Sequence, residues 1–318
     1  MTAPNEPEIL AAIAEAEKAT LDEASIERLA KHPAKAVRLA LAIRGGGSAT
    51  GVEILAKDAN DLIRTFAAGS RSLSDATLKK LAKDKASRVR AAVGKRDELD
   101  GEVAIKLAKD AEFVVRESLA QNQGIPCEAL AILTADSDET VRKALARRAS
   151  KDAKLIRALA EDRSPEVRFA LVSHLREPPP DDAVILLAMD ENCSVRGSVA
   201  GLSHPLPREA AEALISDKYD VVRRVMAGRH DNPIEELAKL IDDDSLIVRR
   251  EALRNPRLPN EFVVAALLGR GNEFAAERLS LLSGHEFVDA VEKAIKLNPD
   301  KEREIGLALA KMRKRDAD

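Results

Sequence analysis

The chain has 318 residues, enough for two ordinary globular domains or one elongated array, with 51 Lys and Arg against 54 Asp and Glu. Its formal net charge of −3 gives no overall attraction to nucleic acid or to acidic substrates. Hydrophobic residues make up 45% but aromatic residues only 2%, which indicates an aliphatic core packed from helices, because strands favour aromatic and β-branched side chains.

We expect no signal for export or for membrane insertion in this sequence. The acidic start MTAPNEPE lacks an apolar core, so we expect no signal peptide. The apolar run from Ala183 to Met189 is too short to span a bilayer. Cys127 and Cys193 lie far apart without CxxC spacing, which fits a reducing compartment, so we expect a cytoplasmic protein without a disulfide or metal centre.

The N-terminal region, residues 1–24, is expected to form a capping helix. Its stretch EPEILAAIAEAEKA, Glu6 to Ala19, is amphipathic but lacks the motif that follows. An array of short helix pairs needs such a cap, because its end repeats have no neighbour to cover them.

Residues 25–259 contain a tandem repeat, which is recognised by an Asp, five residues and an Arg, as in DRSPEVR. Successive arginines are separated by 26, 26, 26, 26, 26, 28, 27 and 26 residues. These nine ladder arginines are Arg38, Arg64, Arg90, Arg116, Arg142, Arg168, Arg196, Arg223 and Arg249. The ladder aspartates that precede them are Asp58, Asp84, Asp110, Asp136, Asp162, Asp190, Asp217 and Asp243, while the first repeat has His32.

Each repeat is predicted to contain two short helices. The first begins at a residue that suits a helix start, about ten residues after the ladder arginine: Ser48, Ser74, Asp100, Pro126, Asp152, Pro178, Pro207, Pro233 and Pro259. The second helix carries the arginine, with apolar residues one before and three after it. The fourth residue after it is nearly always Ala or Gly, which lets neighbouring helices approach closely.

This repeat resembles the HEAT repeat, and its brevity is closest to the bacterial leucine-rich repeat variant family. The resemblance implies a right-handed α-solenoid of about nine to ten repeats, with the second helices lining the concave face. Some relatives carry an iron–sulfur centre, which needs four cysteines where this chain has two. A HEAT-like glycosylase family depends on Trp, which this chain lacks.

The Asp/Arg motif is interpreted as structural rather than catalytic. An enzyme needs its catalytic groups once, whereas this pair recurs at fixed spacing in every repeat. We expect each arginine to bind an aspartate of its own or of a neighbouring repeat, through charge-assisted hydrogen bonds of about 1.5–3 kcal/mol each.

No other catalytic, cofactor or metal motif is apparent. The five histidines show no i, i+4 pair and no cluster of Cys or acidic residues around them. The Gly-rich stretch from Arg44 to Gly51 lacks the preceding strand and the Lys of a phosphate loop, so we expect a helix C-cap and a connection.

A basic stripe follows the ends of the second helices and is the candidate binding site. The positions one, five and six after the ladder arginines include Arg44, Lys95, Arg96, Lys143, Arg147, Arg148, Arg224, Arg229, Arg250 and Arg254. One interpretation is a groove for an anionic partner; the other is the preference of helix C-termini for cations.

The pattern decays in residues 260–318, which are expected to form a degenerate repeat and C-terminal capping helices. The stretch LLGRGNEFAAERLSLL keeps Arg278 but has no matching aspartate. We expect a non-enzymatic, monomeric scaffold that binds a partner protein, with an acidic segment, along its concave face. The alternative is a protein that binds nucleic-acid phosphates through the basic stripe.

Overall fold

The computed structural model describes residues 5–18, 20–270 and 272–315. These residues form 23 α-helices and three short 3-10 helices without any strand, which confirms the all-α prediction. The chain divides into two compact units, Met1–Ala149 and Ser150–Asp318, and each is described by itself.

The N-terminal unit contains five first helices and five second helices, preceded by α1 (Glu6–Ala16). The first helices are α2 (Glu23–Ala30), α4 (Ala49–Leu55), α6 (Asp75–Leu81), α8 (Gly101–Ala108) and α10 (Cys127–Thr134). The second helices are α3 (Lys35–Ile43), α5 (Asp61–Ala68), α7 (Ser87–Gly94), α9 (Phe113–Ala120) and α11 (Glu139–Arg148). Every element that the repeat predicts in this unit is therefore a helix.

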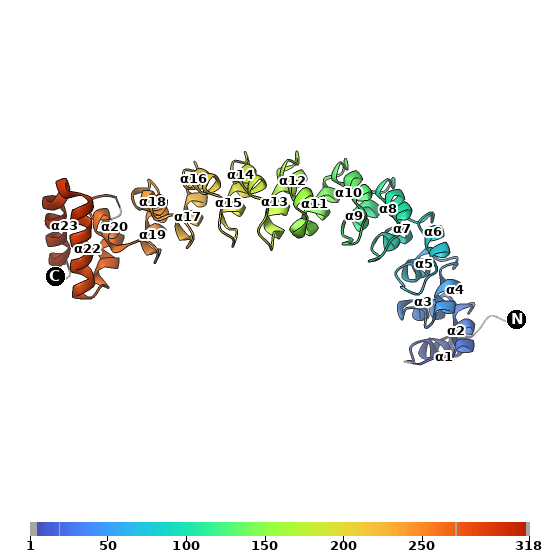
Figure 1. The fold of residues 1–318 in the computed structure, drawn as a ribbon. Coiled ribbons are helices and arrows are strands. Elements are labelled where there is room, and N and C mark those ends of the chain that lie inside the picture. Colours follow the sequence, from blue (N-terminus) through green and yellow to red (C-terminus); the bar gives the residue numbers. More distant parts are fainter. Residues whose placement is uncertain (1–4, 19, 271, 316–318) are drawn as a thin grey trace. The chain divides into compact units, whose positions relative to one another are not determined.

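Helices of the N-terminal unit stack like on like. Each second helix contacts the next one, from α3 to α11, and α1 packs on α3 as though it were the second helix of a preceding repeat. Within this unit the second helices lie on the inner side of an arc, and α4, α6 and α8 lie on its outer side (Figure 1). The predicted cap therefore covers the first repeat; Ala19, at its end, lies outside the described residues.

The C-terminal unit repeats the same arrangement. Its first helices are α12 (Ala153–Ala160), α14 (Asp181–Ala188), α16 (Arg208–Ile215), α18 (Ile234–Lys239) and α20 (Asn260–Ala266). Its second helices are α13 (Pro165–His174), α15 (Cys193–Ala200), α17 (Asp220–Gly228), α19 (Leu246–Arg254) and α21 (Asn272–Ser280). Two longer helices, α22 (Gly284–Leu297) and α23 (Glu302–Arg315), follow, and α22 packs on α20. The chain is thus an all-α helical-repeat solenoid.

The core is aliphatic, because the repeat places Val, Leu and Ala on the buried side of each second helix. Val115 and Leu119, one before and three after a ladder arginine, are fully buried. The small residue that follows serves close packing: a Cβ added to Gly94 would lie 3.3 Å from the backbone nitrogen of Leu119 in the next repeat. Alanine and glycine at this position set the distance between stacked helices.

The predicted helix starts agree with the structure at eight of nine positions and are wrong at Pro178. Side chains of Ser48, Ser74, Asp100 and Asp152 accept hydrogen bonds from first-turn N–H groups. In the segment EPPPDD the cap is Pro180 instead of Pro178, because the insertion shifts the helix by two residues. The prolines occupy the N-cap with extended backbone angles, one residue earlier than the expected first helical position.

The Gly-rich stretch after α3 is a helix C-cap and turn, as predicted. Gly45, Gly46 and Gly47 have φ angles of 89°, 79° and 75°, in the left-handed region that favours glycine. The N–H of Gly46 donates to the carbonyl of Leu41 at 2.9 Å, which closes the end of the helix.

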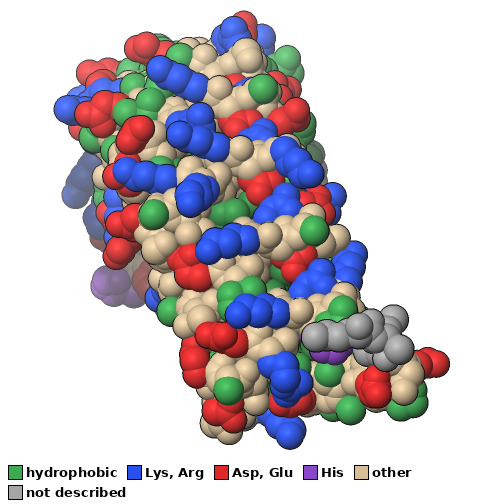
Figure 2. All heavy atoms as spheres, turned by 90° about the vertical axis from the view of Figure 1, so that its right-hand side faces the viewer, with side chains coloured by type: hydrophobic (Ala, Val, Ile, Leu, Met, Phe, Trp, Pro, Cys, Tyr) green, Lys and Arg blue, Asp and Glu red, His purple; other side chains and the backbone are tan. Residues whose placement is uncertain are grey.

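The described helices do not include one with the length and apolar character that a membrane crossing requires. Seen from the side on which α2, α4 and α6 lie in Figure 1, the N-terminal unit presents rows of Lys and Arg with Asp and Glu beside them (Figure 2).

Candidate functional site

Ladder arginines bind the ladder aspartate of the following repeat. In Arg64, Nε donates to Oδ2 of Asp84 at 2.7 Å and Nη2 donates to Oδ1 at 2.8 Å. Its Nη1 donates backward to the carbonyl of Asp58, in its own repeat, at 2.7 Å. The same bidentate pair joins Arg38 to Asp58, Arg90 to Asp110, Arg116 to Asp136, Arg168 to Asp190, Arg196 to Asp217 and Arg223 to Asp243.

Burial and charge make these pairs permanent ion pairs. The side chains of Arg196 and Asp217 are only 8% and 3% exposed. Burial raises the pKa of Asp217, but hydrogen bonds from Arg196 and from the N–H of Tyr219 outweigh it, so the pKa lies below its ordinary value. The same hydrogen bond raises the pKa of Arg196. Groups held this way join repeats and are not free to exchange protons with a substrate.

The last ladder arginine, Arg249, lacks this carboxylate. Its Nη1 donates to the carbonyls of Asp243 and Asp244 at 2.6 and 3.1 Å, as in the other repeats. Gly269 stands 26 residues after Asp243, where the next ladder aspartate would be, and Nε of Arg249 is buried without a hydrogen-bond partner. The ladder therefore ends at this position.

A second ladder, which the sequence analysis missed, lies six residues after the ladder arginines. Nη1 of Arg229 donates to the carbonyls of Ala200 and Leu202 at 2.7 and 2.5 Å, and Nη2 donates to that of His204 at 2.6 Å. Asn255 makes the equivalent bonds to the carbonyls of Ala227 and Arg229. Arg96, Asn122 and Arg278 also reach back to carbonyls at the end of the preceding second helix.

This second ladder satisfies carbonyls that a helix C-terminus leaves without partners. It also changes the interpretation of Arg278. In the sequence this residue was the remnant of the Asp/Arg motif, whereas its bonds to the carbonyls of Leu253, Asn255 and Leu258 make it a counterpart of Arg229. Burial lowers the pKa of Arg278 and of Arg96, because removing a guanidinium from water disfavours its charged form.

The basic stripe therefore divides into three kinds of residue. Backbone carbonyls of the preceding repeat hold four members: Arg44, Arg96, Arg148 and Arg229. Acidic neighbours pair with two more, Lys143 with Glu139 and Arg254 with Glu277. Of the rest, Lys95, Arg147 and Arg224 are exposed, and Arg250 is half-buried. The helix C-terminus interpretation explains the four residues that donate to carbonyls. The cations available to a ligand are those of the last group, Lys95, Arg147, Arg224 and Arg250.

Four aromatic side chains are exposed on second helices or at their N-caps, a feature that the sequence analysis did not use. The chain has six Phe and one Tyr, and none of them lies in the buried core. Phe66, Phe113, Phe169 and Tyr219 are 39–44% exposed, and each stands within four residues of a ladder arginine. On α17 and α19 they are joined by exposed aliphatic residues, Val221, Leu246 and Ile247. We call these exposed positions the second-helix face.

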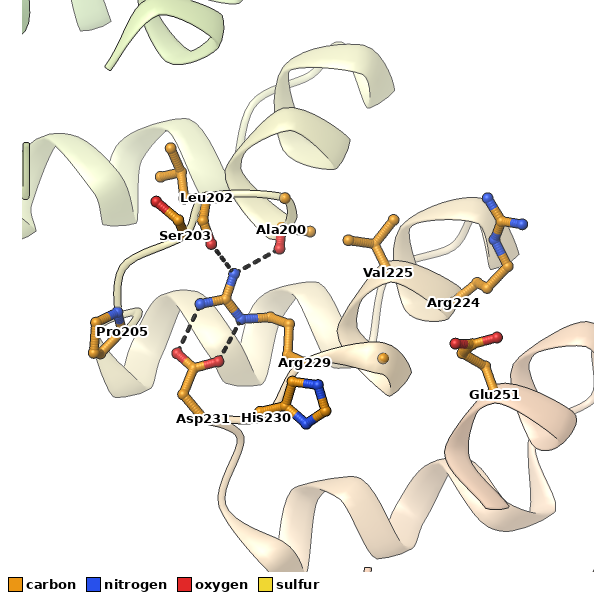
Figure 3. Close-up of a pocket in the computed structure, with 12 residues that line it drawn as sticks. Ala200, Leu202, Ser203, Pro205, Arg224, Val225, Arg229, His230, Asp231 and Glu251 are labelled. Atoms are coloured by element: carbon orange, nitrogen blue, oxygen red, sulfur yellow. Dashed lines mark hydrogen bonds and ion pairs between the residues drawn. The ribbon is translucent and has the colours of Figure 1, made fainter. Parts of the chain in front are cut away.

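A pocket of about 640 Å³ opens at the ends of α15 and α17, beside Glu251 of α19 (Figure 3). Two of the residues that line it have no side chain, because two successive repeats have glycine five residues after the ladder arginine, Gly201 and Gly228. Arg229 crosses the pocket to its carbonyl acceptors, and Arg224 and Glu251 lie on the opposite side (Figure 3). The pocket is thus part apolar and part charged.

Ser203, His230 and Asp231 all line this pocket, but they are not arranged as a catalytic triad. The carboxylate of Asp231 binds Arg229, at 2.8 Å from Nε and 2.7 Å from Nη2. Burial raises the pKa of Asp231, but the effect of the Arg229 guanidinium is in the opposite direction and outweighs it, so the pKa lies below its ordinary value. A triad needs its carboxylate on the imidazole, where it orients the general base.

The side chains available for a metal or a cofactor are few. Within the described residues, no three His, Cys, Asp or Glu side chains come together as a metal-binding group. Cys127 is exposed and Cys193 is half-buried, and both thiols are free.

Comparison of the chain with protein-family models and with curated proteins finds no match.

Proposed function

We propose that this helical-repeat protein is a non-enzymatic scaffold that binds a partner protein along its second-helix face. We also propose that its repeats are of the HEAT-like, leucine-rich repeat variant type, with the right-handed twist that this resemblance implies. The period of about 26 residues and the Asp/Arg motif support that assignment. Two free thiols support a reducing, cytoplasmic location.

The observation that carries the proposal is the surface display of aromatic residues. The aromatic residues lie outside the buried core. Four of them are exposed on second helices or at their N-caps: Phe66, Phe113, Phe169 and Tyr219. Aromatic residues are enriched at the centres of protein interfaces, because they bury much area with few rotatable bonds. Exposed apolar side chains that recur on the second helices of each unit are typical of an interaction surface.

The partner that suits the C-terminal unit is a segment with apolar and acidic side chains. Tyr219, Val221 and Ile247 provide apolar contact, and Arg224 supplies exposed positive charge on α17. The pocket between them accepts a side chain of moderate size because Gly201 and Gly228 leave it open.

Nucleic-acid binding through the basic stripe is the less well supported alternative. Four of the ten stripe residues donate to backbone carbonyls, and two more have acidic neighbours, so fewer charges face a phosphate backbone than the sequence suggests. The remaining cations share the face with Glu251 and with exposed apolar residues.

The test is capture from native cell extract with matched variants. Phe169→Ser together with Tyr219→Ser and Val221→Ser removes apolar contact from the second-helix face, and exposed Leu186 and Met189 on α14 supply a control as a double Ser variant. The proposal expects a protein that the wild type and the control retain and that the face variant loses. Equal capture by all three would overturn it.

A further inference from the structure

We propose that the outer side of the N-terminal unit is a second binding surface, which holds the phosphate backbone of duplex nucleic acid. The surface is a lysine row at the ends of four successive first helices and is separate from the second-helix face. Its members are Lys31, Lys57, Lys80, Lys83, Lys106 and Lys109.

Repetition places these lysines in line. Lys31, Lys57, Lys83 and Lys109 recur every 26 residues, each directly before the ladder aspartate or its histidine counterpart. Lys80 and Lys106 stand one helical turn earlier on α6 and α8. All six side chains are exposed, and Figure 2 shows Lys and Arg running along this side of the unit from repeat to repeat.

Most of this charge is not neutralised. Lys31 pairs with Glu27 at 3.2 Å, whereas the other five lysines have no hydrogen bond or ion pair within the described part of the chain. The adjacent ladder aspartates do not compensate them, because Asp58, Asp84 and Asp110 are already bound by arginines. Residues 28–116 carry 19 Lys and Arg against 11 Asp and Glu, although the whole chain has a net charge of −3.

Helix stability alone does not account for the row. A cation at a helix C-terminus is favourable, but Lys79 and Lys80 lie in the last turn of α6 and Lys83 follows two residues after its end, so like charges crowd one helix terminus. The corresponding residues of α12, α14 and α16 are Ala158 and Glu161, Leu186 and Met189, and Ala213 and Ser216. Equivalent first helices therefore form without lysines.

Phosphate backbone is the partner that these residues fit best. Lysine is a point charge that contacts phosphates without reading bases. Within the described residues, none of the exposed large hydrophobic side chains lies on α2, α4, α6 or α8, so nothing there inserts into a bilayer or stacks on a base. With helices stacked about 8–10 Å apart, four repeats extend roughly 24–30 Å, close to one turn of duplex.

The experiment measures binding of a fluorescent 20-base-pair DNA duplex by anisotropy at several salt concentrations. Five unpaired lysines predict a slope of log affinity against log salt of about −4 to −5, so doubling the salt weakens binding roughly 20-fold. Changing Lys80, Lys83, Lys106 and Lys109 to Gln lowers the slope magnitude by about 3 to 4.

A control with the same loss of charge has Gln in place of Lys154, Lys218, Lys293 and Lys296, exposed residues of the C-terminal unit. The proposal expects the control to keep the wild-type slope. Absence of duplex binding at 20 mM salt, or equal loss in both variants, would overturn it. Tighter binding to vesicles containing phosphatidylserine than to the duplex would overturn the assignment to nucleic acid. The Ser variants of the second-helix face should bind the duplex like the wild type, so the two proposals fail independently.

Discussion

The change Arg196→Ala tests how the ladder holds repeats together. It removes a bidentate pair with Asp217, of 2.5 and 2.9 Å, and two bonds from Nη1 to the carbonyls of Asp190 and Glu191. Asp217 keeps only the N–H of Tyr219, at 2.8 Å, with its side chain 3% exposed. Breaking a buried ion pair on one side costs about 3–5 kcal/mol, because the remaining charge stays buried.

Urea unfolding followed by circular dichroism measures this loss. With a denaturant dependence of about 3 kcal/mol per molar, the midpoint falls by about 1 M or more. Removing both partners, Arg196→Ala with Asp217→Ala, leaves no unpaired charge, so we expect a coupling energy of about 2–3 kcal/mol.

Arg249→Ala is the matched control. This arginine makes the carbonyl bonds but has no carboxylate on Nε, so its loss should destabilise the protein clearly less than that of Arg196. Equal losses at the two positions, a loss below about 1 kcal/mol for Arg196, or no coupling with Asp217 would refute the ladder as a stabilising device.

Three further predictions concern stability. The folded state lowers the pKa of five ladder aspartates, Asp58, Asp84, Asp110, Asp217 and Asp243. The stability that these carboxylates contribute is therefore present above about pH 4 and is lost as the pH falls through their folded pKa values. Urea midpoints measured at pH 7, 5 and 3 should drop mainly between pH 5 and pH 3, and a constant midpoint would contradict this. Gly94→Val should cost about 1–3 kcal/mol by crowding Leu119, whereas Gly101→Ala, which meets nothing within 4 Å, should be neutral or stabilising in thermal melts. Asn255→Ala should cost about 1–3 kcal/mol by leaving buried carbonyls without donors, and an unchanged melting temperature would count against the second ladder.

The helix-pair repeat was predictable because its signal recurs in chemically identical residues. Asp and Arg mark every repeat but the first, and the apolar residues around them have helical spacing. The aspartate that each arginine binds was not predictable. The spacing also allowed an arginine to bind the aspartate of its own repeat, and only the stacked geometry shows that Arg64 reaches forward to Asp84.

The second ladder escaped sequence reasoning because its donors differ and its acceptors are backbone. The position is Arg at Arg96 and Arg229 but Asn at Asn122 and Asn255, and carbonyl acceptors leave no trace in a sequence. The basic residues among them were therefore grouped with exposed arginines into one stripe. The sequence held one usable clue, since seven aromatic residues with an aliphatic core already point to surface positions.

The most direct test of this division compares two arginines of the same region, Arg224 and Arg229, both members of the basic stripe. Arg229 donates to three backbone carbonyls, whereas Arg224 is exposed on the second-helix face beside the pocket (Figure 3). The measurement is the free energy of unfolding of the two Ala variants. Arg229→Ala should lose about 2–4 kcal/mol, and Arg224→Ala should stay within about 0.5 kcal/mol of the wild type. Equal effects, or a larger loss for Arg224→Ala, would contradict the separation of structural from available cations.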